Sequence, residues 1–122
     1  MSVALTQRTF DRTVASGIVV IDWWATWCGP CRAFAPVFEA ASQRHPEIVF
    51  GKVDTDAEQE LARRFQISAM PTLIVFRDGV QAFRRVGMVG AEGLDILLDH
   101  VKALDMAELH RQAHPQSVGH AS

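Results

Sequence analysis

The sequence predicts an α/β fold in which a central mixed β-sheet of about five strands is flanked by about four helices. Apolar runs of strand length alternate with amphipathic stretches along the 122-residue chain, in the order β-α-β-α-β-α-β-β-α. The helices between the early strands act as crossover connections, which make those strands parallel. A two-residue turn, Asp78-Gly79, joins the last two strands and makes them antiparallel. These features indicate a mixed sheet with helices on both faces.

The first third of the chain predicts two strands and two helices. Residues 3–5 form a short edge strand, and Thr6 or Thr9 caps the helix that follows. Residues 18–24 are apolar almost without alternation, which indicates a central strand covered on both faces. The stretch after the cysteines has apolar residues at i, i+3, i+4 and i+7, so it predicts a helix that runs to about Arg44.

The middle of the chain predicts one more strand and one short helix. Residues 48–53 form the strand, which lies parallel to the central one if the preceding helix is a crossover. Thr55 and Glu58 have the spacing of a capping box, in which each side chain bonds to the backbone N–H near the other. We therefore expect a helix to begin at this pair.

The last third of the chain completes the sheet and closes the domain. Residues 72–76 and 80–86 form the antiparallel pair, and residues 91–109 form a closing helix with leucines on one face. Residues 110–122 are polar. We therefore expect one domain over residues 1–109 and a flexible C-terminal tail over residues 110–122.

Composition argues against several classes of partner. The net charge is −2 and 21% of residues are charged, so the chain offers no basic surface for nucleic acid and no acidic tract. We expect no nucleic acid and no membrane among its partners. The N-terminus lacks the charged and apolar segments of a signal peptide, and no apolar run approaches the roughly 20 residues that span a bilayer. The sequence therefore predicts a cytoplasmic protein.

The segment Trp27-Cys28-Gly29-Pro30-Cys31 holds both cysteines of the chain. An apolar strand precedes it and an amphipathic helix follows it, which is the context in which C-x-x-C indicates a redox pair. A disulfide this short closes too few residues to stabilise a fold by much, and cytosolic disulfides are usually catalytic. The motif therefore predicts thiol chemistry.

Asp22 interrupts the apolar run of the central strand. It marks either the solvent side of a half-exposed strand or a buried carboxylate, and its same-face neighbours Val20 and Trp24 argue against the first interpretation. A buried carboxylate is costly unless it is paired or has a function. From these residues alone both interpretations stay open.

The segment Ile21–Cys31 resembles the active-site segment of the thioredoxin family. Asp22, which stands six residues before the first cysteine, Lys52 and the segment Ser68–Thr72 also fall in the family's order and spacing. The resemblance covers residues 3–109. It implies the thioredoxin fold and the activity of a protein disulfide reductase, a thiol–disulfide oxidoreductase.

The resemblance also implies roles for four residues. Cys28 is the nucleophile, since it stands at a helix N-terminus in the kind of C-x-x-C motif for which thioredoxins are a known example of a lowered cysteine pKa. Cys31 is the resolving thiol, which releases the reduced client. Asp22 accepts the Cys31 proton, directly or through a water, and Lys52 is its partner. The alternative for Lys52 is a surface residue of a strand.

The dipeptide Gly29-Pro30 predicts the direction of electron flow. Reducing members of the family carry Gly-Pro between the cysteines, whereas oxidants and isomerases tend to have histidine there. Histidine would stabilise the thiolate further and make the disulfide a stronger oxidant. Its absence favours a reductase.

The segment around Met70-Pro71 resembles the family's cis-proline loop, which faces the C-x-x-C. A cis bond there turns the backbone groups of Met70 outward, where an extended client pairs with them as an added strand. We expect a flat apolar docking patch around the disulfide, in which Trp27 lies at the rim and does not pack in the core. Its members are Trp27, Gly29, Pro30, Met70, Pro71, Gly87 and Met88.

The resemblance implies no bound cofactor and a redox-active Cys28–Cys31 disulfide. NADPH acts only indirectly, through a thioredoxin reductase, and the other partners are disulfide-containing client proteins of a monomeric domain. Two residues depart from the family's usual pattern. Trp23 replaces the more common phenylalanine and needs extra room in the core, and Thr26 replaces an acidic residue or proline and leaves the rim less charged.

Three other functions fit parts of the sequence. A metal site needs more ligands than one C-x-x-C supplies, and only His110 and His114, four residues apart near the C-terminus, could complete it. A binding or scaffold subunit would have no use for two intact cysteines and Asp22. A disulfide isomerase or oxidase would share the fold and differ in redox potential.

Overall fold

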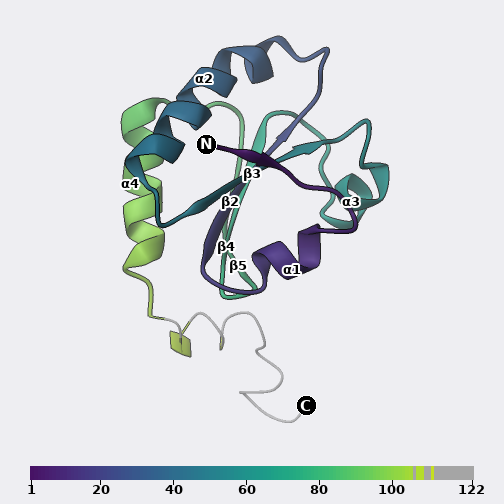
Figure 1. The fold of residues 1–122 in the computed structure, drawn as a ribbon. Helices are drawn as coiled ribbons and strands as arrows, with labels where there is room; N and C mark the ends of the chain where they lie inside the picture. Colours follow the sequence, from purple (N-terminus) through teal and green to yellow (C-terminus); the bar gives the residue numbers. More distant parts are fainter. Residues whose placement is uncertain (106, 109–110, 112–122) are drawn as a thin grey trace.

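The computed structural model describes residues 1–105, 107–108 and 111. One five-stranded sheet, with strand order β1-β3-β2-β4-β5, forms the centre of the molecule (Figure 1). The elements are β1 (Val3–Ala4), α1 (Phe10–Val14), β2 (Ile18–Trp24), α2 (Gly29–Arg44), β3 (Val49–Asp54), α3 (Gln59–Arg64), β4 (Thr72–Arg77), β5 (Val80–Val86) and α4 (Ala91–Lys102). The predicted α/β class, strand number and element order are confirmed.

Strand β2 lies in the middle of the sheet. It pairs with β3 in parallel and with β4 in antiparallel orientation, as expected from the crossover helix and the later turn. The turn residues Asp78 and Gly79 both have positive φ values, 50° and 84°, which suits a tight two-residue hairpin. In the β2–β3 register Asp22 lies opposite Lys52. The carboxyl end of β2 leads directly into the cysteine motif.

The sheet is covered on both faces, with α2 and α4 side by side on one and α1 and α3 on the other (Figure 1). The core between the sheet and the α2–α4 layer includes Val20, Phe34, Phe38, Phe50, Leu73 and Leu98. The core on the other face includes Phe10, Ile21, Trp23, Val53, Leu61 and Phe76. Alternate β2 residues enter different cores, which explains why the strand has no polar face.

Two predicted helix caps, the Thr6 or Thr9 cap of α1 and the Thr55–Glu58 capping box of α3, are wrong because no side chain caps either helix. Thr9 stands at the N-cap of α1, but its hydroxyl accepts a hydrogen bond from the Thr6 N–H, and neither α1 nor α3 has a side-chain cap. The N-cap of α3 is Glu58, and the Thr55 hydroxyl donates to the Trp24 carbonyl at 3.0 Å. The Thr55 hydroxyl therefore ties the end of β3 to the end of β2, beside the cysteine motif.

The closing helix α4 is shorter than the sequence predicts, because it ends at Lys102 and not near residue 109. Arg77, the last residue of β4, places one guanidinium nitrogen 2.9–3.1 Å from the carbonyl oxygens of Val101, Lys102 and Leu104. These contacts satisfy carbonyl groups that a helix end leaves unpaired. The predicted C-terminal tail lies outside the described residues, except Arg111.

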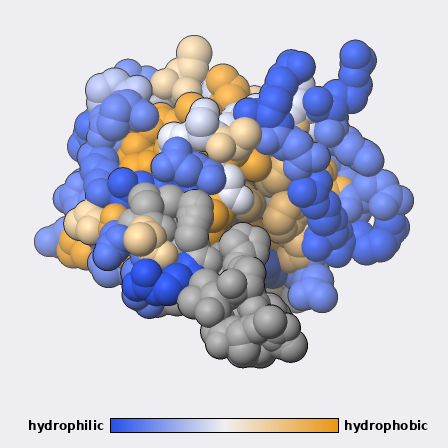
Figure 2. Space-filling model, turned by 90° about the horizontal axis from the view of Figure 1, so that it is seen from below, coloured by the Kyte–Doolittle hydropathy of each residue, from blue (hydrophilic) through white to orange (hydrophobic). Residues whose placement is uncertain are grey.

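The surface at the end where the β4–β5 turn lies carries both polar and apolar side chains (Figure 2). Seen from that end, hydrophilic side chains surround smaller apolar areas (Figure 2). Among the described residues no helix combines the length and apolar character that crossing a membrane requires. The apolar side chains that bear on function lie instead around the cysteines.

Candidate active site

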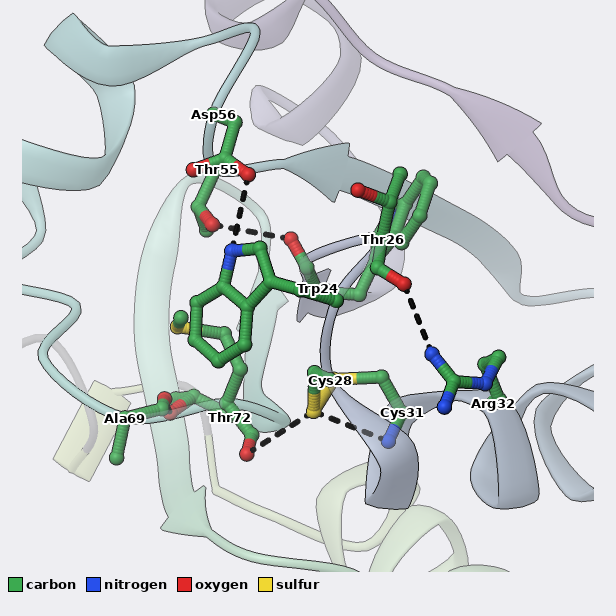
Figure 3. The surroundings of a disulfide bond; sticks show 11 residues. Trp24, Thr26, Cys28, Cys31, Arg32, Thr55, Asp56, Ala69 and Thr72 are labelled. Atoms are coloured by element: carbon green, nitrogen blue, oxygen red, sulfur yellow. Dashed lines mark hydrogen bonds between the residues drawn. A yellow bond between two sulfur atoms is a disulfide. The ribbon is translucent and has the colours of Figure 1, made fainter.

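A disulfide joins Cys28 and Cys31 at the junction of β2 and α2 (Figure 3). Cys28 is the N-cap residue of α2, in extended backbone conformation, and Pro30 occupies the first turn, where a missing N–H costs nothing. Each cysteine residue is only 3% exposed. The two pack with Ala25, and the partly buried Trp24 and Met70 lie against them. The two sulfurs are therefore held in a small, mostly apolar cluster.

The Cys28 sulfur lies where a negative charge is stabilised. It accepts a hydrogen bond from the Cys31 backbone N–H at 3.1 Å and stands at the N-terminus of the 16-residue helix α2. The free N–H groups and positive dipole end of a helix favour an anion at this position. Its other close polar neighbour is the Met70 carbonyl oxygen, at 3.5 Å. When the disulfide is reduced, the Cys31 N–H and the helix N-terminus favour a Cys28 thiolate, whereas the Met70 carbonyl oxygen gives an anion no support.

Asp22 is fully buried in β2, on the sheet face that α2 covers. Neither carboxylate oxygen has a hydrogen-bond partner among the described residues. Burial raises the pKa of Asp22 to about 7, and the positive charge of Lys52 offsets only part of that rise. A carboxyl group with a pKa near 7 can both accept and release a proton at neutral pH.

Lys52 lies beside Asp22 and at the edge of a solvent-open pocket. Its ammonium nitrogen lies 5.1 Å from the centroid of the Trp24 ring, within the range of a cation–π contact. The pocket has a volume of about 320 Å³, and Trp24, Lys52 and Asp54 contribute to its lining. Water can therefore reach the Lys52 side of the Asp22–Lys52 pair while the carboxyl itself stays buried.

The Met70–Pro71 peptide bond is cis, and two hydrogen bonds hold the loop around it. The Thr72 hydroxyl donates to the Ala69 carbonyl at 2.6 Å, and the Gly87 N–H donates to the Pro71 carbonyl at 2.8 Å. The fold therefore brings Pro71 beside Gly87, which follows β5 and has a φ of +100°. Met88 is 40% exposed next to it.

Trp27 lies at the surface beside the cysteines, with 65% of its area exposed. Its indole N–H donates to an Asp56 carboxylate oxygen at 3.1 Å. Trp23, one of the two residues that depart from the family pattern, is fully buried, and its indole N–H has no partner within the described part of the chain. Trp23 fits because it shares its core with aromatic side chains, those of Phe10 and Phe65.

Two residues near the disulfide were not singled out from the sequence. Asp56 holds the Trp27 indole, and no sequence pattern pairs these two residues. Arg32 follows Cys31 directly, and its guanidinium reaches back to donate to the Thr26 carbonyl at 2.9 Å (Figure 3). A charged residue next to a reactive cysteine is a signal that sequence analysis could have used.

The geometry gives no support to a metal centre in the described residues. Residues 1–105, 107–108 and 111 contain no group of three or more His, Cys, Asp or Glu side chains arranged around a metal position. His110 and His114, the two histidines of the metal hypothesis, lie outside the described residues.

The fold and the site together define a thiol–disulfide oxidoreductase. A C-x-x-C disulfide at a helix N-terminus, a buried carboxylate and a cis-proline loop meet at the carboxyl end of the central strand. Comparison with known proteins identifies the family. The sequence model of the thioredoxin family matches residues 1–103.

Named relatives and solved structures agree with that match. A putative thioredoxin 2 of Streptomyces coelicolor is 44% identical over 111 residues, which cover 90% of this chain and 83% of the relative. A thioredoxin of Mycobacterium tuberculosis is 43% identical and covers 80% of this chain and 84% of its own length. The structure of Plasmodium falciparum thioredoxin superposes with a TM-score of 0.75 at 31% identity, covering 82% of this chain and 98% of that one. The chain belongs to the thioredoxin family and is a protein disulfide reductase.

Proposed function

We propose that this chain reduces client disulfides in two thiol–disulfide exchanges, with Cys28 as nucleophile and Cys31 as resolving thiol. The Cys28 thiolate attacks a client sulfur, a mixed disulfide forms, and the first client thiolate leaves and takes a proton. The Cys31 thiolate then attacks the Cys28 sulfur and releases the second client thiolate. Two electrons pass from the protein to the client. The observation that supports this order is the Cys31 N–H bond to Cys28 at the start of α2.

Asp22 accepts the proton that Cys31 must lose before the second exchange. It lies on the sheet face that α2 covers, it has a pKa near 7, and none of the described residues engages its oxygens. The positive charge of Lys52 favours the ionised form of Asp22. Lys52 also lines the pocket that admits water. The proton passes from Cys31 to Asp22, directly or through a water. From Asp22 it reaches solvent through the pocket that Lys52 lines.

Clients dock on the surface around the disulfide. The proposed surface takes in the exposed side chains of Trp27 and Met88, the α2 residues Gly29 and Pro30, and the loop of Met70 and Pro71 with Gly87. Met70 packs against the cysteines, and the Gly87 N–H donates to the Pro71 carbonyl. An extended client segment pairs with the backbone of Met70 and passes its disulfide to Cys28. Methionine side chains adapt to varied partners, which suits a reductase with several clients.

A thioredoxin reductase that draws on NADPH returns the Cys28–Cys31 disulfide to the dithiol. The chain binds no cofactor of its own, acts as a monomer and works in the cytoplasm as a step of electron transport. The membership in the thioredoxin family supports this cycle. A coupled assay with such a reductase and NADPH measures it.

Alkylation of the reduced protein tests the proposed order of attack. With iodoacetamide near pH 7, we expect rapid modification of Cys28 and slow modification of Cys31, since the Cys28 sulfur stands at the N-cap of α2 and accepts the Cys31 N–H. Peptide mapping identifies the modified cysteine, and the pH dependence of the rate gives a Cys28 pKa below the ordinary thiol value of about 8.5. Faster labelling of Cys31 in the folded protein would reverse the assignment.

Replacing Met88 with aspartate tests the docking surface. We expect the KM for an insulin substrate to rise about fivefold, as for the loss of about 1 kcal/mol at an interface side chain. Ile96→Asp is the matched control, since Ile96 is 63% exposed on the solvent side of α4. Equal effects of the two substitutions would contradict a docking role for Met88.

A further inference from the structure

Arg32 is held beside the disulfide in a defined position. It stands in the first turn of α2, and its Nη1 donates to the Thr26 carbonyl at 2.9 Å. A Cβ placed on Gly29 would lie 3.8 Å from Arg32 Nη2, so the guanidinium covers the turn between the two cysteines. The planar head of this arginine therefore lies at the rim of the redox site, exposed to solvent.

The charge of Arg32 is not neutralised within the described residues. Its guanidinium makes no ion pair there, and the bond to Thr26 uses one of its five N–H donors. Asp56, an acidic residue near the disulfide, accepts a hydrogen bond from the Trp27 indole (Figure 3). Thr26, the residue that Arg32 contacts, is neutral. The remaining N–H groups of Arg32 are free to bind a carboxylate from another molecule.

We propose that Arg32 is a specificity-determining residue that binds a carboxylate on the client segment next to the target disulfide. The inference rests on the proposed function, because it requires that clients approach Cys28 on this face. Arginine suits the task, since its fork of N–H donors matches the two oxygens of a carboxylate. The carboxylate of Asp56, which accepts a hydrogen bond from the Trp27 indole, repels the client carboxylate. The two charges therefore orient a client so that its acidic residue lies toward α2.

A client carboxylate fits this site better than a free anion does. One exposed guanidinium holds a small anion weakly, because solvent screens the attraction. A client is in a different situation, since its other contacts with the docking surface, and then the bond to Cys28, keep its carboxylate close to Arg32. The effective concentration of that carboxylate is far above that of an anion in solution. The expected ligand is therefore an acidic residue near a client cysteine.

Paired peptide substrates test the proposal on the whole chain. Each probe is a short cysteine peptide oxidised to its symmetrical disulfide, with Glu, Gln or Lys placed in turn on either side of the cysteine. The reduced protein is mixed with each peptide, the reaction is stopped with acid, and the released thiol is measured. In one of the two placements we expect the Glu peptide to react about fivefold faster than the Gln peptide, the upper range for an exposed ion pair. The difference shrinks between about 0.05 M and about 0.5 M salt.

Substitution of Arg32 then separates this role from others. We expect Arg32→Gln to bring the Glu-to-Gln rate ratio close to one, and Arg32→Glu to favour the Lys peptide. Arg12→Gln, on the exposed side of α1, removes the same charge elsewhere and should leave the ratio unchanged. A ratio that persists in Arg32→Gln would overturn the proposal, and so would an equal loss of rate with all three peptides. If the wild-type protein reduces all the peptides at the same rate, only the role of Arg32 is contradicted. If it reduces none of them, the proposed function is contradicted.

Discussion

Replacing Cys28 with serine should abolish the reduction of insulin disulfides, with dithiothreitol as the electron source. We expect a loss of about a thousandfold or more, because a serine hydroxyl has neither the acidity nor the nucleophilicity of the thiolate. Cys31→Ser should also lose turnover, but at a later step. It still attacks the client through Cys28 and then has no thiol to release it.

The two cysteine variants differ in what they retain. Cys31→Ser should accumulate as a mixed disulfide with its client, seen as an added mass that a reductant removes, and Cys28→Ser should not. The double variant is the control for nonspecific attachment. Trapping by Cys28→Ser instead would mean that Cys31 attacks first. Full activity in either single variant would remove the dithiol mechanism altogether.

Replacing Asp22 with asparagine should change how the stability of the protein depends on pH. The pKa of Asp22 is raised from 3.8 to about 7 by burial, so the folded state binds its proton more tightly than the unfolded state does. Proton binding by Asp22 therefore stabilises the folded state. This contribution to the free energy of unfolding is fully present below pH 3.8 and is lost as the pH rises to about 7. At 1.36 kcal/mol per pKa unit, the loss amounts to about 4 kcal/mol.

The comparison of wild type with Asp22→Asn isolates this effect. Other carboxyls act in the opposite direction, such as Asp95, whose pKa the hydrogen bonds from Arg44 and His45 lower. Urea titrations of both proteins at several pH values give the difference in free energy of unfolding. We expect that difference to move in favour of the asparagine variant between pH 4 and pH 7. A constant difference over that range would mean that Asp22 keeps an ordinary pKa.

The same variant tests the role of Asp22 as proton acceptor. We expect the release of client from the mixed disulfide to slow about tenfold at pH 7 and to lose its rise with pH near 7. The effect is smaller than the roughly hundredfold loss typical of a positioned general base, because water near Lys52 can take part of the role. Rapid-quench analysis of the mixed disulfide measures this step. An unchanged pH profile would remove Asp22 from the mechanism.

The central part of the fold could be predicted from the sequence, because its signals are local. The apolar run of β2 and the Asp78-Gly79 turn each act over a few residues, and the structure confirms both. The end of α4 could not be predicted in this way, because Arg77 on another element binds its last carbonyls. The predicted capping box was wrong because both of its residues have partners elsewhere in the fold: the Thr55 N–H and hydroxyl donate to the Trp24 carbonyl, and the Glu58 carboxylate accepts from the Gln7 N–H.

In the candidate site, too, some contacts could be predicted from the sequence and others could not. Cys28 and Cys31 are two residues of one motif, so their proximity follows from the sequence. The pairing of Asp22 with Lys52 depends on the β2–β3 register, which the family resemblance supplied. The Trp27–Asp56 contact joins residues 29 positions apart through a loop conformation that no local pattern encodes.

Two of the three tryptophans lie on opposite sides of the sheet, and this gives the protein an internal optical reporter. Trp24 packs against the cysteine cluster, whereas Trp23 lies in the core on the opposite face. A disulfide quenches the fluorescence of a nearby indole, so opening the Cys28–Cys31 bond should brighten Trp24 and leave the emission of Trp23 as a constant background. The redox state of the native chain can then be followed by its own emission, with no added label.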